Sequence, residues 1–214
     1  MFGEKLTVLK KAIQIIILLS AISLLAACAT RPAQTGALNQ MLSWPQRQQQ
    51  LTQIKSWRLS GEIGGQIQQQ NKRQAFSASV IWQQQADNYH ISVFGPLGAD
   101  MTQLQGNSTH AVLQTSNHQT ITGQNPEQLL QAELGWTLPV ANLYYWIRGI
   151  PAPNTPSTLS FDHYHHLLKL TQQGWHIDYM QYTAVNNRYD LPSKIFMTRG
   201  NLTLRLIISQ WQLS

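Results

Sequence analysis

Two kinds of residue are scarce in this sequence, and each scarcity excludes a class of protein. The chain has one cysteine, so no disulfide can form within it. Charged residues make up only 11% of the chain, and its arginines are dispersed along it. A nucleic-acid-binding surface needs a patch or stripe of Lys and Arg. We therefore expect neither a disulfide-stabilised fold nor a nucleic-acid partner, despite a formal net charge of +6.

Motifs of common enzymes and metal sites are also missing. There is no Gly-x-Ser-x-Gly motif of the α/β-hydrolases, and the few carboxylates include no close pair of the glycosidase kind. His163 and His165 would share one face of a strand, as two metal ligands do. Zinc usually takes three or four protein ligands, however, and this stretch resembles a hairpin turn. We expect no enzyme, no metal and no cofactor.

The first 27 residues have the layout of a secretory signal peptide. Three lysines precede an apolar run from Ile13 to Leu25, which the small residues Ala26 and Ala27 follow. Together with Cys28 they match the bacterial lipobox, in which the cysteine thiol receives a diacylglyceryl group and the freed amine is acylated. The alternative is an uncleaved transmembrane anchor, but the apolar run is shorter than the ~20 residues that a span needs. We expect Cys28 to carry the lipid anchor, because several acyl chains hold a protein on a membrane stably.

The residue after the cysteine bears on which membrane receives the protein. In enteric-type bacteria an Asp there retains a lipoprotein in the inner membrane, so Ala29 is compatible with delivery to the outer membrane. Residues 28–40 are small, polar and broken by Pro32 and Gly36, which is typical of a flexible tether. We predict a signal peptide at 1–27, a lipidated tether at 28–40 and one folded domain at 41–214.

Hydrophobic periodicity predicts a mainly β domain with helices at its start and centre. Ser43 and Gln46 fit a capping box with Pro45 in the first turn, and glycines at 61, 64 and 65 indicate a bend or bulge. Leu202, Leu204, Leu206 and Ile208 alternate on the last strand. The helices are expected at 44–55, from 125 to near 135, and at 138–149. The strands are expected at 57–67, 76–82, 89–93, 100–105, 111–114, 119–122, 158–161, 167–171, 175–182, 193–198 and 202–211.

About eleven strands at hairpin spacing predict a single curved antiparallel sheet. About three helices would cover its open end or its concave face. A strongly curved sheet of this size can enclose space for a ligand, as small barrels do. Periodicity alone leaves open whether the interior is filled or hollow.

At this level of detail the chain resembles the LolB family of outer-membrane lipoprotein receptors over essentially the whole part after the leader. The resemblance rests on the order of six segments: ASVIWQ (78–83), YHISVFGPLG (89–98), WIRGIP (146–151), WHIDYMQY (175–182), LPSKI (191–195) and LRLIISQW (204–211).

The resemblance implies a half-open β-barrel whose helical lid covers an apolar cavity. That cavity would take the acyl chains of lipoprotein cargo from the periplasmic carrier LolA, and the receptor would insert the cargo into the inner leaflet of the outer membrane. The implied partners are a LolA-type carrier, acylated cargo and outer-membrane lipids. We expect a monomer anchored through Cys28 with its domain in the periplasm. The alternative is a structural or assembly lipoprotein that binds a protein partner on a concave sheet.

Acyl chains offer no hydrogen bonds, so their binding must come from buried apolar area, at roughly 25 cal/mol per Å². Inward-facing aromatic and aliphatic residues suit that task, although each could equally be ordinary core. The predicted cavity residues are Trp82, Tyr89, Ile91, Leu104, Trp146, Tyr179, Met197 and Leu206.

A tight turn, Gly95-Pro96-Leu97-Gly98, carries a large apolar residue at its tip. Turn tips usually project into solvent. The resemblance implies that Leu97 touches the membrane during insertion, and the alternative is that it folds back onto the sheet. Elsewhere Arg148 ends a helix, where a cation complements the helix dipole, so we expect a structural role for it.

Overall fold

The computed structural model describes residues 36–69, 72–95, 101–134 and 137–214, which belong to one compact unit, Gln34–Ser214. The leader, Cys28 and the start of the expected tether lie outside the described residues. So do Pro96, Leu97 and Gly98, whereas Gly95 is described and half-buried.

The described residues form one antiparallel sheet of eleven strands, ordered β6-β5-β4-β3-β2-β1-β11-β10-β9-β8-β7. Every expected strand is present, and the shift at each end is a few residues. The strands are β1 (Ser56–Gln69), β2 (Lys72–Gln85), β3 (Asn88–Phe94), β4 (Thr102–Gly106), β5 (Ala111–Gln114), β6 (Thr120–Gly123), β7 (Ser157–Phe161), β8 (Leu167–Gln172), β9 (Trp175–Val185), β10 (Tyr189–Arg199) and β11 (Leu202–Leu213).

Three short helices accompany the sheet in the described part of the chain: α2 (Trp44–Thr52), α3 (Pro126–Leu134) and α4 (Val140–Trp146). The capping interaction expected at the start of α2 is present, since the Ser43 backbone N–H donates to Gln46 Oε1 at 2.9 Å. Asn125 Oδ1 accepts from the first N–H groups of α3 at 2.9 and 3.2 Å. No helix in the described ranges is both long and apolar enough to cross a membrane.

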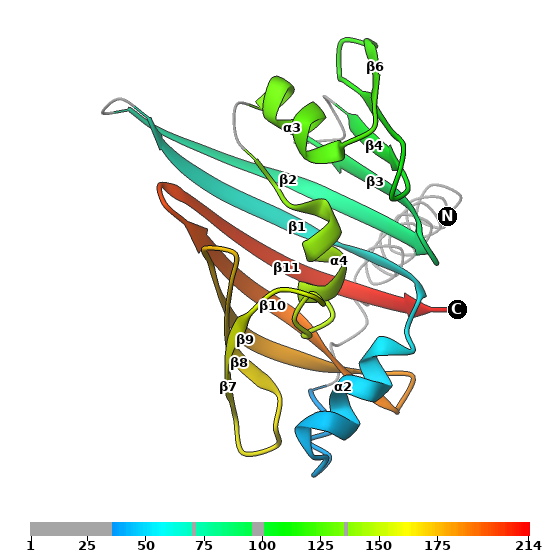
Figure 1. Ribbon diagram of the computed structural model, residues 1–214, viewed down its shortest axis with the longest axis vertical. Coiled ribbons are helices and arrows are strands. Elements are labelled where there is room, and N and C mark those ends of the chain that lie inside the picture. The colour runs from blue at the N-terminus through cyan, green and yellow to red at the C-terminus, as the bar shows by residue number, and fades with distance from the viewer. Residues whose placement is uncertain (1–35, 70–71, 96–100, 135–136) are drawn as a thin grey trace, which may run out of the picture. The chain divides into compact units, whose positions relative to one another are not determined.

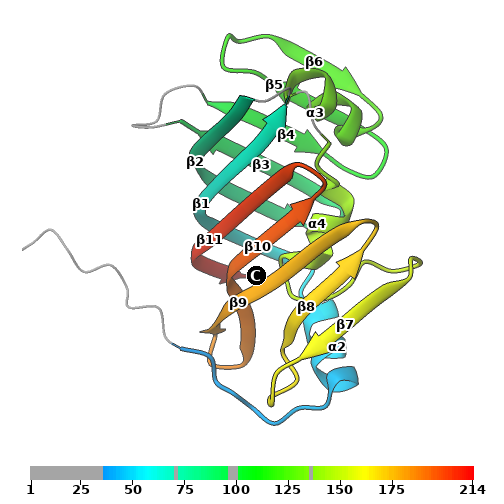
Figure 2. The same cartoon turned by 90° about the vertical axis from the view of Figure 1, so that its left-hand side faces the viewer.

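The sheet stays open because its two edge strands, β6 and β7, do not pair with each other. The chain runs from one edge to the other through α3 and α4, in front of the middle strands (Figure 1). Seen from the side, both edges bend toward the face on which the three helices lie (Figure 2). The helices therefore cover the concave face, as the sequence predicts.

A β-bulge interrupts the pairing of β1 with β11 beside Gly61, one of the glycines at which the sequence predicts a bend or bulge, and its extra residue is Ser209 on β11. The register between β1 and β11 shifts between Ser60 and Gly61. A Cβ at Gly61 would lie 2.1 Å from the backbone oxygen of Ile207, so only glycine fits this close approach. A Cβ at Gly64 would meet nothing nearer than the Phe76 oxygen at 3.7 Å.

Apolar side chains of alternate residues on the central strands make up the core. Leu202, Leu204, Leu206 and Ile208 are all buried on β11, as their spacing predicts. On β1, Trp57 packs against two other indoles. Its ring centroid lies 5.3 Å from that of Trp82 and 5.4 Å from that of Trp211. Aromatic pairs at this spacing each add roughly 0.5–1.5 kcal/mol beyond the area they bury.

We predict that Gly61→Ala lowers the free energy of unfolding by about 2 kcal/mol, because β1 and β11 must separate to admit the methyl group. Gly64→Ala is the matched control on the same strand and should change it by less than about 0.5 kcal/mol. Thermal unfolding of the full chain in detergent, followed by circular dichroism, measures both. Equal melting temperatures for the two variants would contradict the proposed contact.

Candidate functional site

An apolar cavity of about 410 Å³ lies between the concave face of the sheet and the helices. Its described wall comes from strands β1 to β5, β10 and β11, from α3 and α4, and from the residues next to α4. Every side chain in that wall is apolar except Thr102. The wall consists of Leu59, Ile63, Phe76, Val80, Trp82, Ile91, Val93, Thr102, Leu104, Leu113, Leu130, Leu138, Val140, Leu143, Ile147, Met197, Leu204 and Leu206.

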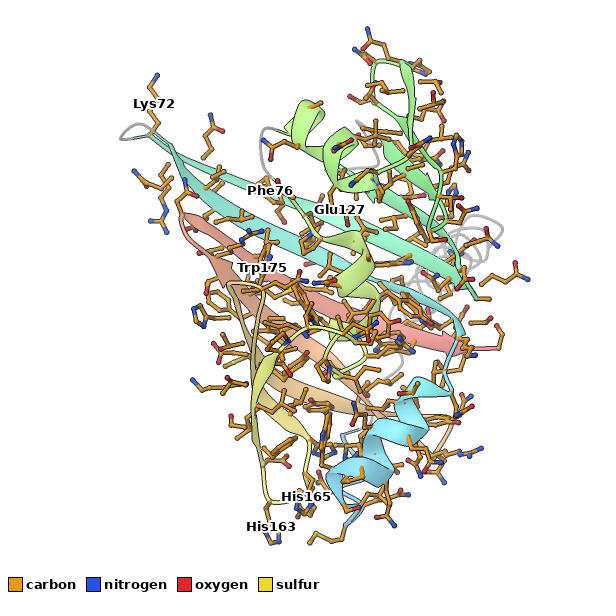
Figure 3. All side chains as sticks on the ribbon, in the orientation of Figure 1. Lys72, Phe76, Glu127, His163, His165 and Trp175 are labelled. Atoms are coloured by element: carbon orange, nitrogen blue, oxygen red, sulfur yellow. The ribbon has the colours of Figure 1, made fainter. Side chains whose placement is uncertain are left out.

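The alternation of side chains along each strand places these residues on one face. Leu59 pairs with Trp82 on β2, and Ile63 pairs with Leu206 on β11, so cavity residues also lie side by side across strands. Phe76, labelled on β2 in Figure 3, lies over Gly65, where a Cβ would come within 2.3 Å of its ring. The glycine therefore leaves room for the Phe76 ring at the cavity wall.

Five of the eight predicted cavity residues line this space: Trp82, Ile91, Leu104, Met197 and Leu206. The other three, Tyr89, Trp146 and Tyr179, are not part of its wall. Sequence reasoning also missed thirteen wall residues, among them Ile63, Val80, Leu113 and Leu143. The signal for two of them was present, because Ile63 and Val80 share their strand faces with the apolar residues Leu59 and Trp82.

Trp146 and Tyr179 instead hold α4 against the sheet. The Trp146 indole is fully buried and donates from Nε1 to Gln172 Oε1 at 2.8 Å. The Tyr179 hydroxyl donates to the Trp146 backbone oxygen at 2.8 Å, and burial raises the pKa of Tyr179 above its ordinary value. Both polar groups are thus satisfied inside the protein, as buried Trp and Tyr usually are. Tyr89 lies in a second, smaller pocket of about 280 Å³.

Comparison with known proteins places this architecture in a family. Residues 55–211 match the family model described as outer membrane lipoprotein LolB. The chain belongs to the LolB family. A protein named outer-membrane lipoprotein LolB from Coxiella burnetii is 39% identical over 200 residues, which cover 92% of each chain. Another of that name from Ectopseudomonas mendocina is 36% identical, over 92% of this chain and 95% of the relative.

Among solved structures, a LolA superfamily protein from Nitrosomonas europaea is similar at 10% identity, with a TM-score of 0.47 over 81% of this chain and 94% of the other. The family membership rests on the sequence matches, which span the sheet and the helices. The role of the chain is accordingly that of a lipoprotein receptor of the LolB type.

In this LolB-family chain, Arg148 links the two helices α2 and α4. Its side chain is buried, with Nε donating to Tyr144 O at 2.9 Å and Nη1 donating to Leu51 O at 3.2 Å and Ile54 O at 2.6 Å. The guanidinium carbon lies 3.9 Å from the centroid of the Tyr144 ring. Burial lowers the pKa of Arg148, and the nearby Tyr144 and Tyr145 partly offset this decrease. One cation thus serves carbonyls at the ends of both helices, a structural role as expected.

The chain just before α2 is fastened to the sheet by a buried carboxylate. The Leu38 backbone N–H donates to Asp190 Oδ1 at 2.6 Å, and the Ala184 N–H donates to Gly36 O at 3.2 Å. Arg47 Nη1 lies 3.5 Å from Asp190 Oδ2, and Arg47 Nη2 donates to Gln40 O at 2.9 Å. Residues 36–40, which we expected to belong to the tether, are therefore bonded to the folded domain.

His166 extends this cluster to the β7–β8 hairpin. Its Nε2 lies 2.9 Å from Asp190 Oδ2 and its Nδ1 lies 2.8 Å from Asp162 Oδ2. Burial alone would raise the pKa of each carboxyl, but hydrogen bonds and the charge of His166 outweigh it and lower both pKa values.

His163 and His165 are exposed at the end of the same hairpin (Figure 3). The stretch is a hairpin turn, as expected from the sequence, with His165 at a positive φ of 59°. Among the described residues no group of three or more His, Cys, Asp or Glu is placed to hold a metal ion.

We predict that Arg148→Met lowers the free energy of unfolding by about 2–4 kcal/mol, because it leaves three carbonyl oxygens without this donor. Arg205→Met is the control, since Arg205 is exposed on β11. Denaturant unfolding of the full chain in detergent measures the difference. A loss of no more than that of the control would show that Arg148 does not hold the helices.

We predict that the contribution of the Asp190 carboxylate to stability disappears in acid. A lowered pKa in the fold means that this contribution is present above the unfolded pKa of about 4 and is lost as the pH falls through the folded value. The melting temperature of Asp190→Asn should lie below that of the wild type at pH 7, and the gap should narrow as the pH falls below the unfolded pKa of about 4. Asp178→Asn, at an exposed ion pair with Lys169, should show little gap throughout. A gap for Asp190→Asn that is independent of pH would contradict this account.

Proposed function

We propose that the chain binds the acyl chains of lipoproteins in the apolar cavity and transfers them from a LolA-type carrier to the outer membrane. The observation that carries the proposal is the cavity itself, about 410 Å³ of space whose wall is apolar at every described residue but Thr102. A cavity of that size and character suits a hydrocarbon ligand.

Hydrophobic burial supplies the driving force for this binding. Each methylene that leaves water for an apolar wall gains about 0.8 kcal/mol, without any need for directed hydrogen bonds. A receptor of this kind can therefore accept many lipoproteins through the chains that they share. It needs neither a catalytic group nor a cofactor, and we propose that it acts as a monomeric binding protein rather than an enzyme.

The anchor in this proposal is lipid on Cys28, with the folded domain on the periplasmic side of the outer membrane. Because Gly36 is bonded to the sheet, the chain from Cys28 to Gly36 can reach at most about 30 Å. The domain would then stay close to the bilayer into which it delivers cargo.

The alternative of a scaffold that binds a protein partner on its concave face has less support. The three helices cover that face, and Arg148 ties two of them together. A partner would have to displace α4 to reach the inner side of the sheet.

We predict that Ile63→Trp reduces acyl-chain binding by about tenfold. Ile63 is half-buried on the cavity wall, and the indole ring of a tryptophan there would occupy space that the acyl chain needs. Excluding two methylenes from the cavity costs about 1.6 kcal/mol. Glu62→Trp is the matched control, because Glu62 is the preceding residue on β1 and is exposed on the opposite face.

Transfer of an acylated lipoprotein from purified carrier to membranes that contain the full chain measures the effect. Wild-type transfer by a correctly folded Ile63→Trp variant would show that cargo binds elsewhere.

We predict that Leu97→Glu blocks release of cargo into the membrane while uptake from the carrier continues. The resemblance implies that Leu97 touches the membrane, and one leucine entering an apolar phase gains about 2 kcal/mol, enough to direct insertion. Loaded receptor should then accumulate, which pull-down of the receptor with its cargo would detect. A clear fall in melting temperature or a failure to accept cargo would place Leu97 in the core instead.

A further inference from the structure

The smaller pocket lies beside the apolar cavity, with which it shares two wall residues, Trp82 and Val140. It is formed where the β2–β3 turn and the β4–β5 turn meet the start of α3 and one side of α4. Successive residues of α4 face the two spaces, since Leu143 lines the cavity and Tyr144 lines the pocket. Trp82 and Val140 therefore form part of the wall of both spaces.

Tyr89 lines this pocket, and its hydroxyl, which has essentially no exposed surface, is without a hydrogen-bond partner among the described residues. Gly106 lies close to it, because a Cβ at Gly106 would come within 2.8 Å of the hydroxyl oxygen. Burial, together with the negative charge of Glu127, raises the pKa of Tyr89 to about 12, so the hydroxyl keeps its proton at neutral pH. A buried donor with no acceptor costs about 1–3 kcal/mol. A ligand carbonyl or hydroxyl would recover this cost once the side chains around the Tyr89 hydroxyl move to admit it.

The other polar groups of the pocket restrict the charge of such a ligand. Its described wall includes two carboxylates, Glu127 and Asp87, and no Lys, Arg or His. Glu127 projects from α3 (Figure 3), where its Oε1 accepts the Ala141 N–H at 3.4 Å. A phosphate or carboxylate would be repelled by these two carboxylates. Arg148, which lies on the Tyr144 ring of the wall, is already bonded to three carbonyl oxygens. An uncharged head rich in carbonyl groups fits the chemistry better.

Building on the proposed function, we propose that this pocket binds the uncharged polar head of acylated cargo while the chains occupy the apolar cavity. The head in question carries the ester and amide carbonyls of the acylated glyceryl-cysteine. Tyr89 donates a hydrogen bond to one of these carbonyls, and Trp82 and Val140 mark the boundary between head and chains. The pocket thereby selects acyl chains that carry a neutral head over those of anionic phospholipids.

Photo-crosslinking of the full chain in phosphatidylglycerol-containing nanodiscs tests this placement. Benzoylphenylalanine replaces Ser108 at the pocket or Phe76 at the cavity, and the ligand is a synthetic peptide with a tripalmitoylated glyceryl-cysteine. Mass spectrometry of the adducts identifies which part of the lipopeptide each position contacts. We expect Ser108 to be joined to the glyceryl-cysteine or the peptide and Phe76 to the acyl methylenes.

The outcomes separate this inference from the function on which it rests. If Phe76 captures acyl methylenes while Ser108 captures only methylenes, phospholipid or nothing, the head-group pocket is refuted and the acyl-chain cavity stands. If Phe76 captures no acyl chain, the proposed function fails, and the inference fails with it.

A second variant tests the role of the hydroxyl itself. Tyr89→Phe should lower the yield of the Ser108 adduct relative to the Phe76 adduct by about threefold or more, the effect of one lost hydrogen bond. Tyr189→Phe removes a hydroxyl from a residue outside the pocket and should leave the ratio unchanged. An unchanged ratio in Tyr89→Phe would overturn the assignment of Tyr89 as the donor.

Discussion

The cavity depends on helices that hydrogen bonds hold over the sheet, so that their side chains need not fill the space beneath them. The inner face of the sheet is apolar from Leu59 to Leu206, and such a face normally collapses onto whatever packs against it. Here α2 and α4 are joined at their ends by Arg148, while α4 is also held through Trp146 and Tyr179. Because Arg148, Trp146 and Tyr179 are not part of the cavity wall, these attachments hold the helices over the sheet without occupying the space between them.

The same arrangement divides the interior by chemistry. Apolar groups of α4 face the larger space, whereas its tyrosines and the carboxylate of Glu127 border the smaller one. A seven-residue helix thus presents two different surfaces to two compartments. An amphiphile and not a plain hydrocarbon is the ligand that matches both surfaces at once.

The strands and helices could be predicted from the sequence because alternation and capping are local signals. Ser43 with Gln46, the glycine at 61 and the leucines of β11 each indicated the element in which they lie. The cavity wall could be predicted only in part. Trp82 and Trp146 look alike in sequence, yet the first lines the cavity and the second is sealed in the core. Only the packing of α4 on Gln172 distinguishes them, and that contact joins residues 26 apart in the chain. Bonds such as Leu38 to Asp190, 152 residues apart, leave no local trace.

The fastening of residues 36–40 also determines how force enters the domain. Tension on the chain before Gly36 would reach the sheet through the bond from Ala184 and then through the Leu38 bond to Asp190. Asp190 passes that load to Arg47 at the start of α2 and to His166 in the β7–β8 hairpin. The pull is thereby shared among β9, β10, α2 and the β7–β8 hairpin, and of these elements only β10 contributes a residue, Met197, to the described cavity wall. Tension on the tether would therefore act mainly on elements that do not line the cavity.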